Sequence, residues 1–304
     1  MVRSKINQKL YVIKSIRLSS NANKNEEDSR WMEEIKILEA CKHINVIRYK
    51  NCFITTETQC DQANPSAQLI VHIVMEYADA GDMNVHIKRQ REVQLFFAEA
   101  QVRNWLVQLS LALQYLHKIR VMHRDIKTQN IFMTSTKLLK LGDFGVSKVL
   151  SPGKEFTETA IGTPTNLCPE IANGQKYDFK SDIWSLGCVV HEICCLKPAF
   201  QSKSWEEMLK KIRTASYPPI PSSYSVTLSD LIRVMLKVDP ARRPTAYQVA
   251  TCNALKDDFE SHLEHVKKLP ASSRISDQSS DSATKNSCSS RGSGDGTSSG
   301  NCSL

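Results

Sequence analysis

HRDIKTQN, residues 123–130, and DFG, residues 143–145, are the most informative stretches of this sequence. The first contains a carboxylate, a lysine and an amide at its third, fifth and eighth positions, and the carboxylate of the second follows 18 residues after that of the first. Carboxylate and amide oxygens are the ligands that hard cations such as Mg²⁺ prefer. The alternatives are a surface loop with scattered charges and an ordinary turn at DFG.

The first stretch matches the HRDxKxxN pattern of protein kinase catalytic loops, and DFG lies at the separation that kinases show. This resemblance implies that Asp125 accepts the proton of the attacking hydroxyl. It implies that Lys127 neutralises charge on the transferring γ-phosphate, and that Asn130 and Asp143 hold Mg²⁺. Agreement at all of these positions makes a chance match a poor explanation.

Two charged residues near the N-terminus complete the expected catalytic set. Lys14 ends the strand-like run YVIK and fits the lysine that holds the α- and β-phosphates of ATP. Its partner is expected to be Glu34, on a helix. The neighbouring Glu33 is a competitor, and Glu34 is preferred because kinases place this glutamate directly before an IxxL run. Each motif alone is weak.

The run IVMEYA, residues 73–78, is interpreted as a strand that leads into the hinge between two lobes. Backbone groups of Glu76 and Ala78 are expected to bond adenine, with Met75 behind the pocket. The ring is expected to lie between two further side chains, Val12 and Phe132. Ordinary core packing would also suit most of these residues.

GTP at 162–164 and CPE at 168–170 resemble the end of a kinase activation segment. By this resemblance Thr163 belongs to that segment, and Thr159 is the expected activating phosphorylation site, with Arg124 as the partner of its phosphate. Glu170 is expected to form a structural ion pair with Arg243. The nearby DIWSLG segment resembles the part of a kinase that supports the catalytic loop.

Several segments resemble the NIMA-related (NEK) kinases, and the resemblance covers residues 2–252. They include YVIK, IVMEYADAGDM, HRDIKTQNIF, LGDFGVSKVL, IGTP and YDFKSDIWSLGCVVHEICCLKPAF. Three features depart from the family. Met1 aligns within the second strand, so the glycine-rich GxGxxG loop is missing from this sequence. Thr165 and Asn166 stand where two tyrosines are usual. A polar loop over residues 55–68 is longer than expected.

The predicted fold is α+β: a two-lobed kinase fold with an incomplete small β lobe and a large helical lobe, because strand-like patterns come first and helical patterns follow. Residues 1–254 are assigned to the kinase domain, with the truncated small lobe and hinge at 1–78 and the large lobe at 79–254. A charged amphipathic helix is expected at 255–269. Residues 270–304 are rich in Ser and Gly and are expected to form a disordered tail.

Composition favours a soluble, cytoplasmic protein. Hydrophobic residues make up 41% of the chain, enough for a sizeable core. The sequence has no run of 18 apolar residues and no signal peptide, and its ten cysteines lack metal-ligand spacing. Its net charge of +8 is interpreted as a solvated surface, and the alternative is that it helps to hold phosphates or an anionic partner such as a microtubule surface. The family resemblance adds cytoskeletal or microtubule-associated partners, and neither a membrane nor a nucleic acid is expected.

The expected function is that of a non-specific serine/threonine protein kinase, which uses ATP and Mg²⁺ and acts on protein substrates. One alternative is a pseudokinase or scaffold with weak or no activity, because the glycine-rich loop is missing, or an incomplete gene product. A kinase acting on sugars or antibiotics is a further alternative, but it would not need the GTP…PE segment.

Overall fold

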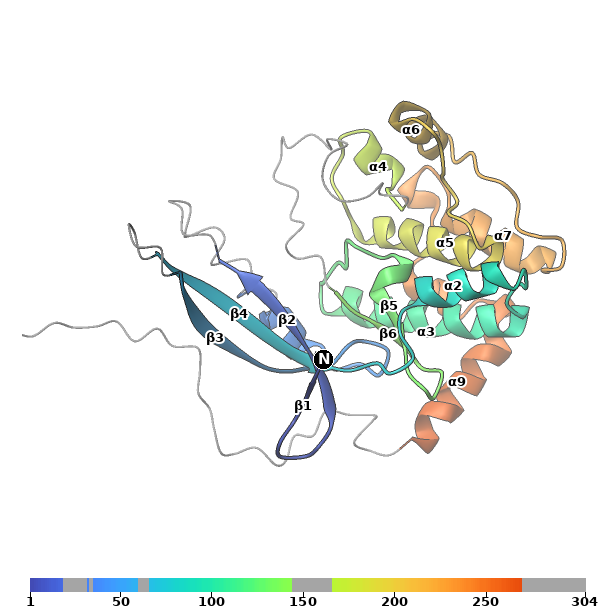
Figure 1. The fold of residues 1–304 in the computed structure, drawn as a ribbon. Coiled ribbons are helices and arrows are strands. Elements are labelled where there is room, and N and C mark those ends of the chain that lie inside the picture. The colour runs from blue at the N-terminus through green and yellow to red at the C-terminus, as the bar shows by residue number, and fades with distance from the viewer. Residues whose placement is uncertain (19–31, 33–34, 60–65, 144–165, 270–304) are drawn as a thin grey trace, which may run out of the picture.

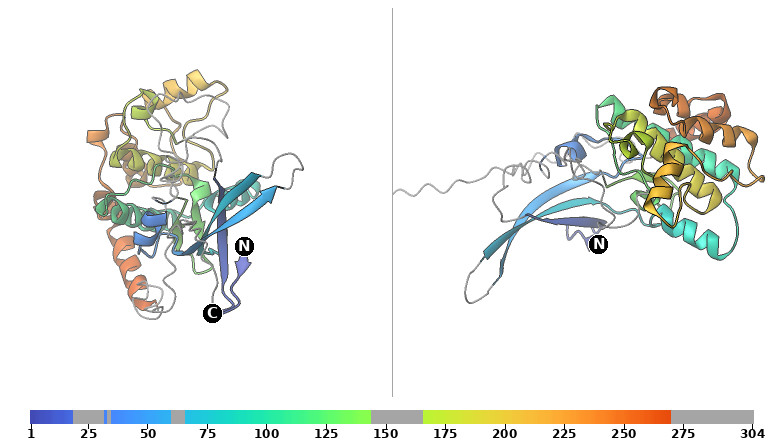
Figure 2. Two further views of the ribbon diagram at one scale, coloured as in Figure 1. Left: turned by 90° about the vertical axis from the view of Figure 1, so that its left-hand side faces the viewer. Right: turned by 90° about the horizontal axis from the view of Figure 1, so that it is seen from above.

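The computed structural model describes residues 1–18, 32, 35–59, 66–143 and 166–269, which form two lobes. A curved sheet lies to one side of a larger group of helices (Figure 1), and the right-hand view of Figure 2 shows the same separation. The predicted α+β, two-lobed architecture is confirmed.

Four antiparallel strands form the sheet of the small lobe: β1 (Val2–Arg3), β2 (Leu10–Arg17), β3 (Tyr49–Gln59) and β4 (Ser66–Glu76). Their order across the sheet is β1-β2-β4-β3, so β2 pairs with a strand that is distant in sequence. Val71 and Ile73 of β4 are fully buried, as alternate residues on the inner face of a sheet should be. Lys14 pairs in register with Ile73, which places the lysine at the centre of the sheet.

The prediction of a long polar loop at residues 55–68 is wrong. β3 continues to Gln59 and β4 begins at Ser66, with Thr55 opposite Ile70 in the ladder. The side chains of Thr55, Thr56 and Glu57 are exposed, so the polar composition reflects contact with water. Threonine, which is branched at Cβ, favours extended backbone even where nothing apolar is buried.

The large lobe contains a two-stranded sheet and most of the helices. The strands are β5 (Ile131–Met133) and β6 (Leu139–Leu141). The α-helices are α2 (Met83–Glu92), α3 (Glu99–Lys118), α4 (Pro169–Ala172), α5 (Phe179–Cys195), α6 (Trp205–Arg213), α7 (Val226–Met235), α8 (Ala246–Ala250) and α9 (Lys256–Lys268). Single 3₁₀ turns are η1 (Thr128–Asn130), η3 (Pro240–Arg242) and η4 (Asn253–Leu255).

Helix α5 runs through the core of the large lobe. It begins at a capping box in which Asp178 accepts from backbone amides of the first turn and Ser181 bonds back to the Asp178 amide. Most of its residues are buried. The Trp184 ring stacks on Phe200 at a centroid distance of 5.3 Å, and its indole nitrogen donates to the carbonyl of Leu167 at 2.9 Å. The helix therefore offers a rigid support for the loops around it.

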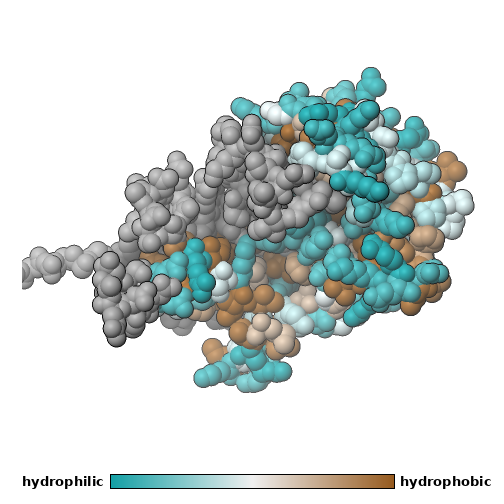
Figure 3. All heavy atoms as spheres, turned by 45° about the horizontal axis from the view of Figure 1, so that its top comes forward, coloured by the Kyte–Doolittle hydropathy of each residue, from teal (hydrophilic) through white to brown (hydrophobic). Residues whose placement is uncertain are grey.

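Helix α9 ends the described part of the chain, and the predicted tail at 270–304 lies outside the described residues. An ion pair of 2.8 Å between Asp258 and Arg103 fastens α9 to α3. Among the described residues, no helix is both long and apolar enough to cross a membrane. On the face drawn in Figure 3, hydrophobic residues of the helical lobe are scattered among hydrophilic ones.

Candidate active site

The loop before η1 brings three polar side chains together. Lys127 Nζ lies 2.7 Å from Asp125 Oδ2, and Asn130 Nδ2 donates to the same oxygen at 3.0 Å and to the Asp125 carbonyl at 2.8 Å. These three residues were predicted from the sequence as a group, and the turn η1 places them side by side. A carboxylate held by a lysine and an amide in this way has a fixed orientation.

The loop is anchored from below by Asp182 on α5, which is fully buried. Its carboxylate accepts hydrogen bonds from the backbone amides of His123 and Arg124, both at 3.0 Å, from the Tyr177 hydroxyl at 2.6 Å and from His117 Nε2 at 2.8 Å. Burial acts to raise the pKa of Asp182, but the hydrogen bond and positive charge of His117, with the bond from Tyr177, hold that pKa below its ordinary value. A negative charge is thereby stabilised beneath the loop.

The backbone at Arg124 adopts a left-handed conformation, with φ of 66°. Such a conformation costs free energy for a non-glycine residue and persists only where surrounding contacts impose it. The hydrogen bond from the Arg124 amide to Asp182 is such a contact.

His123 and Gly142 connect this loop to the DFG position. His123 is completely buried, burial lowers its pKa, and its Nε2 lies 3.2 Å from the Gly142 carbonyl oxygen. A Cβ at Gly142 would lie 2.7 Å from Ile47 and 3.0 Å from Phe132, so only glycine fits. The close packing fixes the strand end that carries Asp143, whose own φ is 55°.

Asp143 meets Lys14 across the interface of the two lobes. Lys14 Nζ lies 2.8 Å from Asp143 Oδ1, although 129 residues separate them in sequence. Strand β2 brings the lysine and the end of β6 brings the carboxylate. Both side chains remain partly exposed, at 32% and 46%, so a solvent-borne ligand can reach both charges.

The predicted adenine-binding residues lie where the hinge passes from β4 to the large lobe. Val12 and Met75 are register partners in the sheet. The hinge chain then runs along β5, with a bridge between Asp82 and Phe132 and a bond from the Ala80 amide to the Met133 carbonyl at 2.9 Å. Glu76 ends β4 and Ala78 follows two residues later. The roles assigned to these residues stay predictions.

The predicted structural pair is present. Arg243 Nη1 and Nη2 each lie 2.7 Å from one carboxylate oxygen of Glu170, and both side chains are buried. Burial opposes ionisation of Glu170, but the hydrogen bonds from Arg243 and from the Ser181 hydroxyl lower its pKa. The pair joins α4 to the turn η3 beneath α5.

Three predicted residues cannot be placed. Glu34, Thr159 and Thr163 lie outside the described residues, and so does Phe144 of DFG. Their assignments rest on the sequence alone.

The donor set suits a hard cation and a phosphate. The Asn130 amide nitrogen donates to the backbone carbonyl and to Oδ2 of Asp125, while its amide oxygen receives no hydrogen bond within the described ranges. That oxygen and the Asp143 carboxylate are the types of ligand that Mg²⁺ takes together with phosphate oxygens. A group of three or more His, Cys, Asp or Glu side chains that could form a metal cage does not occur in the described part of the chain. The Asn130 amide oxygen and the Asp143 carboxylate, with Lys14 beside the latter, suit a metal ion that also takes phosphate oxygens.

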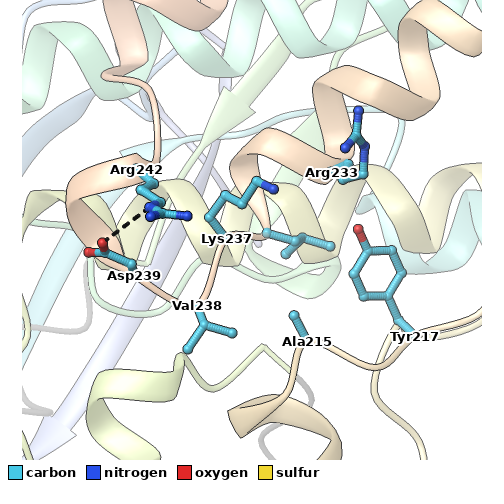
Figure 4. Close-up of a pocket in the computed structure, with 8 residues that line it drawn as sticks. Ala215, Tyr217, Arg233, Lys237, Val238, Asp239 and Arg242 are labelled. Atoms are coloured by element: carbon cyan, nitrogen blue, oxygen red, sulfur yellow. Dashed lines mark ion pairs between the residues drawn. The ribbon is translucent and has the colours of Figure 1, made fainter.

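A cavity of about 560 Å³ lies elsewhere in the large lobe (Figure 4). It is lined by residues of α7, η3 and the loops beside them, including Tyr217, Arg233 and Arg242. None of the predicted site residues lines it, so this cavity is separate from the candidate active site.

Sequence reasoning missed three side chains that shape the site. His117 and Tyr177 complete the set of donors around Asp182, and Lys140 forms an ion pair of 2.8 Å with Glu76 beside the hinge. Tyr177 lies five residues before Asp182, just outside the DIWSLG segment that was expected to support the loop. His117 and Lys140 act over long sequence separations, and no local pattern marks them.

Comparison with known proteins agrees with this geometry. The protein kinase domain family matches residues 1–254. The mouse serine/threonine-protein kinase Nek1 is 38% identical over 82% of this chain, the human Nek5 is 39% identical over 81%, and a probable serine/threonine-protein kinase nek3 of Dictyostelium discoideum is 36% identical over 93%. The matched parts are 19%, 32% and 24% of those proteins, so the chain spans between about a fifth and a third of their lengths.

Proposed function

Because the chain belongs to the protein kinase family, and within it to the NIMA-related serine/threonine kinases, we propose that it transfers the γ-phosphate of ATP to serine and threonine hydroxyls of proteins. The observation that carries the proposal is the orientation of Asp125, fixed by Lys127 and Asn130 on a loop that Asp182 anchors.

Asp125 would orient the acceptor hydroxyl and accept its proton at a carboxylate oxygen. Lys127, 2.7 Å from that carboxylate, would also offset charge on the phosphoryl group in transfer. In a reaction with little covalent participation by the protein, such positioning and charge stabilisation supply most of the catalysis.

Lys14 and Asp143 would bind the nucleotide phosphates. Their contact places a cation and an anion at one point between the lobes. Lys14 would pair with the α- and β-phosphates, while Asp143 and Asn130 would hold Mg²⁺. When bound, the metal ion bridges phosphate oxygens and neutralises their charge.

Phosphorylation of Thr159 is proposed as the activating modification. A phosphate adds nearly two negative charges, and Arg124 is the cation assigned to it. The Arg124 amide is already bonded to Asp182, so an ion pair at its side chain would reach the catalytic loop directly.

Protein substrates are proposed, and cytoskeletal or microtubule-associated proteins are the first class to test. The proposal rests on the family resemblance and on the net charge of +8, which suits an anionic surface. A cytoplasmic location is proposed as well, because composition and cysteine usage favour it.

The test is a phosphotransfer assay of the full chain with Mg·ATP and a generic protein substrate, followed by mapping of the modified residues. We expect phosphate on serine and threonine, and strongly reduced transfer by the variant Lys14→Met. Lys9→Met, which changes an exposed lysine in the turn before β2, is the matched control. Nucleotide binding without any transfer would instead favour a scaffold.

A further inference from the structure

Lys140 and Glu76 form an ion pair between the lobes, beside the hinge. Lys140 Nζ lies 2.8 Å from Glu76 Oε1, and the two side chains are 9% and 24% exposed. Glu76 is the last residue of β4 in the small lobe, and Lys140 is the central residue of β6 in the large lobe. The pair thus connects two strands that belong to different lobes.

Glu76 also holds the segment that leads into β3. The same Oε1 accepts from the Arg48 amide at 2.7 Å, and the Glu76 amide donates to the Arg48 carbonyl at 2.9 Å. One carboxylate oxygen therefore joins three chain segments. A change at this residue would affect all three.

The same segment is bonded to β6 by its backbone. The Leu141 amide donates to the Asn45 carbonyl at 2.8 Å, the Ile47 amide to the Leu141 carbonyl at 2.8 Å, and Asn45 Nδ2 to the Leu139 carbonyl at 2.9 Å. These bonds fix β6 on both sides of Lys140.

Strand β6 leads directly to Asp143, which follows Lys140 by three residues and is the proposed ligand of Mg²⁺. Glu76, in turn, begins the hinge backbone to which adenine binding is assigned. The pair therefore connects the phosphate end of the proposed nucleotide site to its adenine end. A largely desolvated ion pair is weak evidence for stability, and its best-attested role is to select one arrangement.

We propose that Lys140 is a positioning residue, which acts through Glu76 to hold the hinge backbone at the correct distance from Lys14 and Asp143. This proposal rests on the proposed kinase function. Its consequence is that the pair sets nucleotide affinity while contributing little to the chemical step. Lys140 is not among the residues to which contacts with the nucleotide or the acceptor are assigned.

The experiment measures the dissociation constant for Mg·ATP, and KM and kcat for phosphotransfer, in the full chain. Lys140→Met should raise both the dissociation constant and KM about five- to tenfold, with kcat within about twofold, because ground-state placement of the nucleotide is lost. Lys140→Arg keeps the charge and should bring the dissociation constant and KM back to within about twofold of the wild-type values. Lys50→Met, at an exposed lysine of β3, should have no effect.

Glu76→Gln is the second variant. Glutamine keeps an acceptor for the Arg48 amide but removes the charge, so Glu76→Gln should reproduce the affinity loss of Lys140→Met. The double variant should lose no more affinity than either single variant. Additive losses would show that the two residues act separately and would overturn the proposal.

Other outcomes would also overturn it. Unchanged affinity with a lower melting temperature would make the pair merely structural, and a rise in activity would mean that it restrains the active arrangement. If the wild-type chain neither binds nucleotide nor transfers phosphate, the proposed function fails separately. Amide hydrogen exchange at residues 76–78 and 139–141 then tests the pair, because faster exchange in Lys140→Met supports it and unchanged exchange overturns it.

Discussion

Asp125 is the residue to which the proposed function assigns the proton of the acceptor hydroxyl. Its substitution Asp125→Asn keeps the shape of the side chain but removes the proton acceptor. We expect kcat to fall by at least about 10²-fold, the usual scale for a positioned general base, with folding and nucleotide binding retained. Asp230→Asn, at an exposed carboxylate of α7, is the control. Near-normal turnover in Asp125→Asn would contradict the assignment of Asp125 as the proton acceptor.

Asp182 shows how a single buried carboxylate can determine the shape of a catalytic loop. An asparagine there can present only one acceptor oxygen to four donors, and its amide group would face N–H groups. We expect Asp182→Asn to cost about 3 kcal/mol or more of unfolding free energy and to lower kcat in parallel. Urea unfolding and initial rates measured on the same preparations test this; loss of activity at unchanged stability would contradict it.

The same residue contributes a pH dependence. Because the folded-state pKa of Asp182 is lowered, its contribution to the free energy of unfolding is fully present above its unfolded pKa. The contribution is lost as the pH falls through the folded pKa. Asp182→Asn should therefore reduce the acid sensitivity of unfolding in that range.

At the scale of elements, the Glu170–Arg243 pair connects α4 and η3 beneath α5. Arg243→Met would leave a buried carboxylate without its partner, which costs roughly 3–5 kcal/mol. Thermal unfolding should show a large fall in the melting temperature. Arg242→Met changes the adjacent, largely exposed arginine and should change the melting temperature little. Similar midpoints for the two variants would show that the buried pair contributes little.

Helices and buried strands of this chain can be predicted from sequence because their periodicity reports burial. Apolar residues recur at helical spacing between Phe97 and Ile119, and the observed α3 (Glu99–Lys118) lies within that stretch. The outer half of the β3–β4 hairpin was predicted as a loop, because exposed strands carry no apolar alternation.

Some contacts of the candidate site can likewise be predicted from sequence, and others cannot. Asp125, Lys127 and Asn130 are close in sequence, so one motif predicts their contact. The His117–Asp182 and Lys140–Glu76 contacts each join residues more than 60 positions apart, and only the packing of α3 against α5 and of β6 against the hinge produces them.

For the whole molecule, buried titratable groups make stability depend on pH in opposing directions. Burial lowers the pKa of His43 and of His262 to about 4. Between their ordinary value near 6.5 and pH 4, the unfolded chain binds protons that the folded chain does not, so acid destabilises the fold. Glu192 acts against this trend, since burial raises its pKa to about 7.

Glu192→Gln isolates that opposing contribution. Between pH 4.5 and 7 the unfolded chain releases a proton that Glu192 retains when folded, so rising pH lowers the unfolding free energy by about 3 kcal/mol. The glutamine variant should lose this component and gain stability relative to wild type as the pH rises to 8. Urea titrations at several pH values measure it, with Glu260→Gln on the exposed side of α9 as control. Parallel curves for wild type and Glu192→Gln would contradict the assignment.

The strand order β1-β2-β4-β3 has a consequence for how the chain is made. Tyr11 pairs with Glu76, so β2 leaves the ribosome before its partner β4, whose paired residue is synthesised 65 residues later. At typical rates of about 5–20 residues per second, this delay is roughly 3–13 seconds. During that time the strand that carries Lys14 has an open edge, which is a template for unwanted pairing. The helical lobe, with more local contacts, should form readily once synthesised. The small lobe is therefore where chaperone dependence and aggregation during synthesis should concentrate.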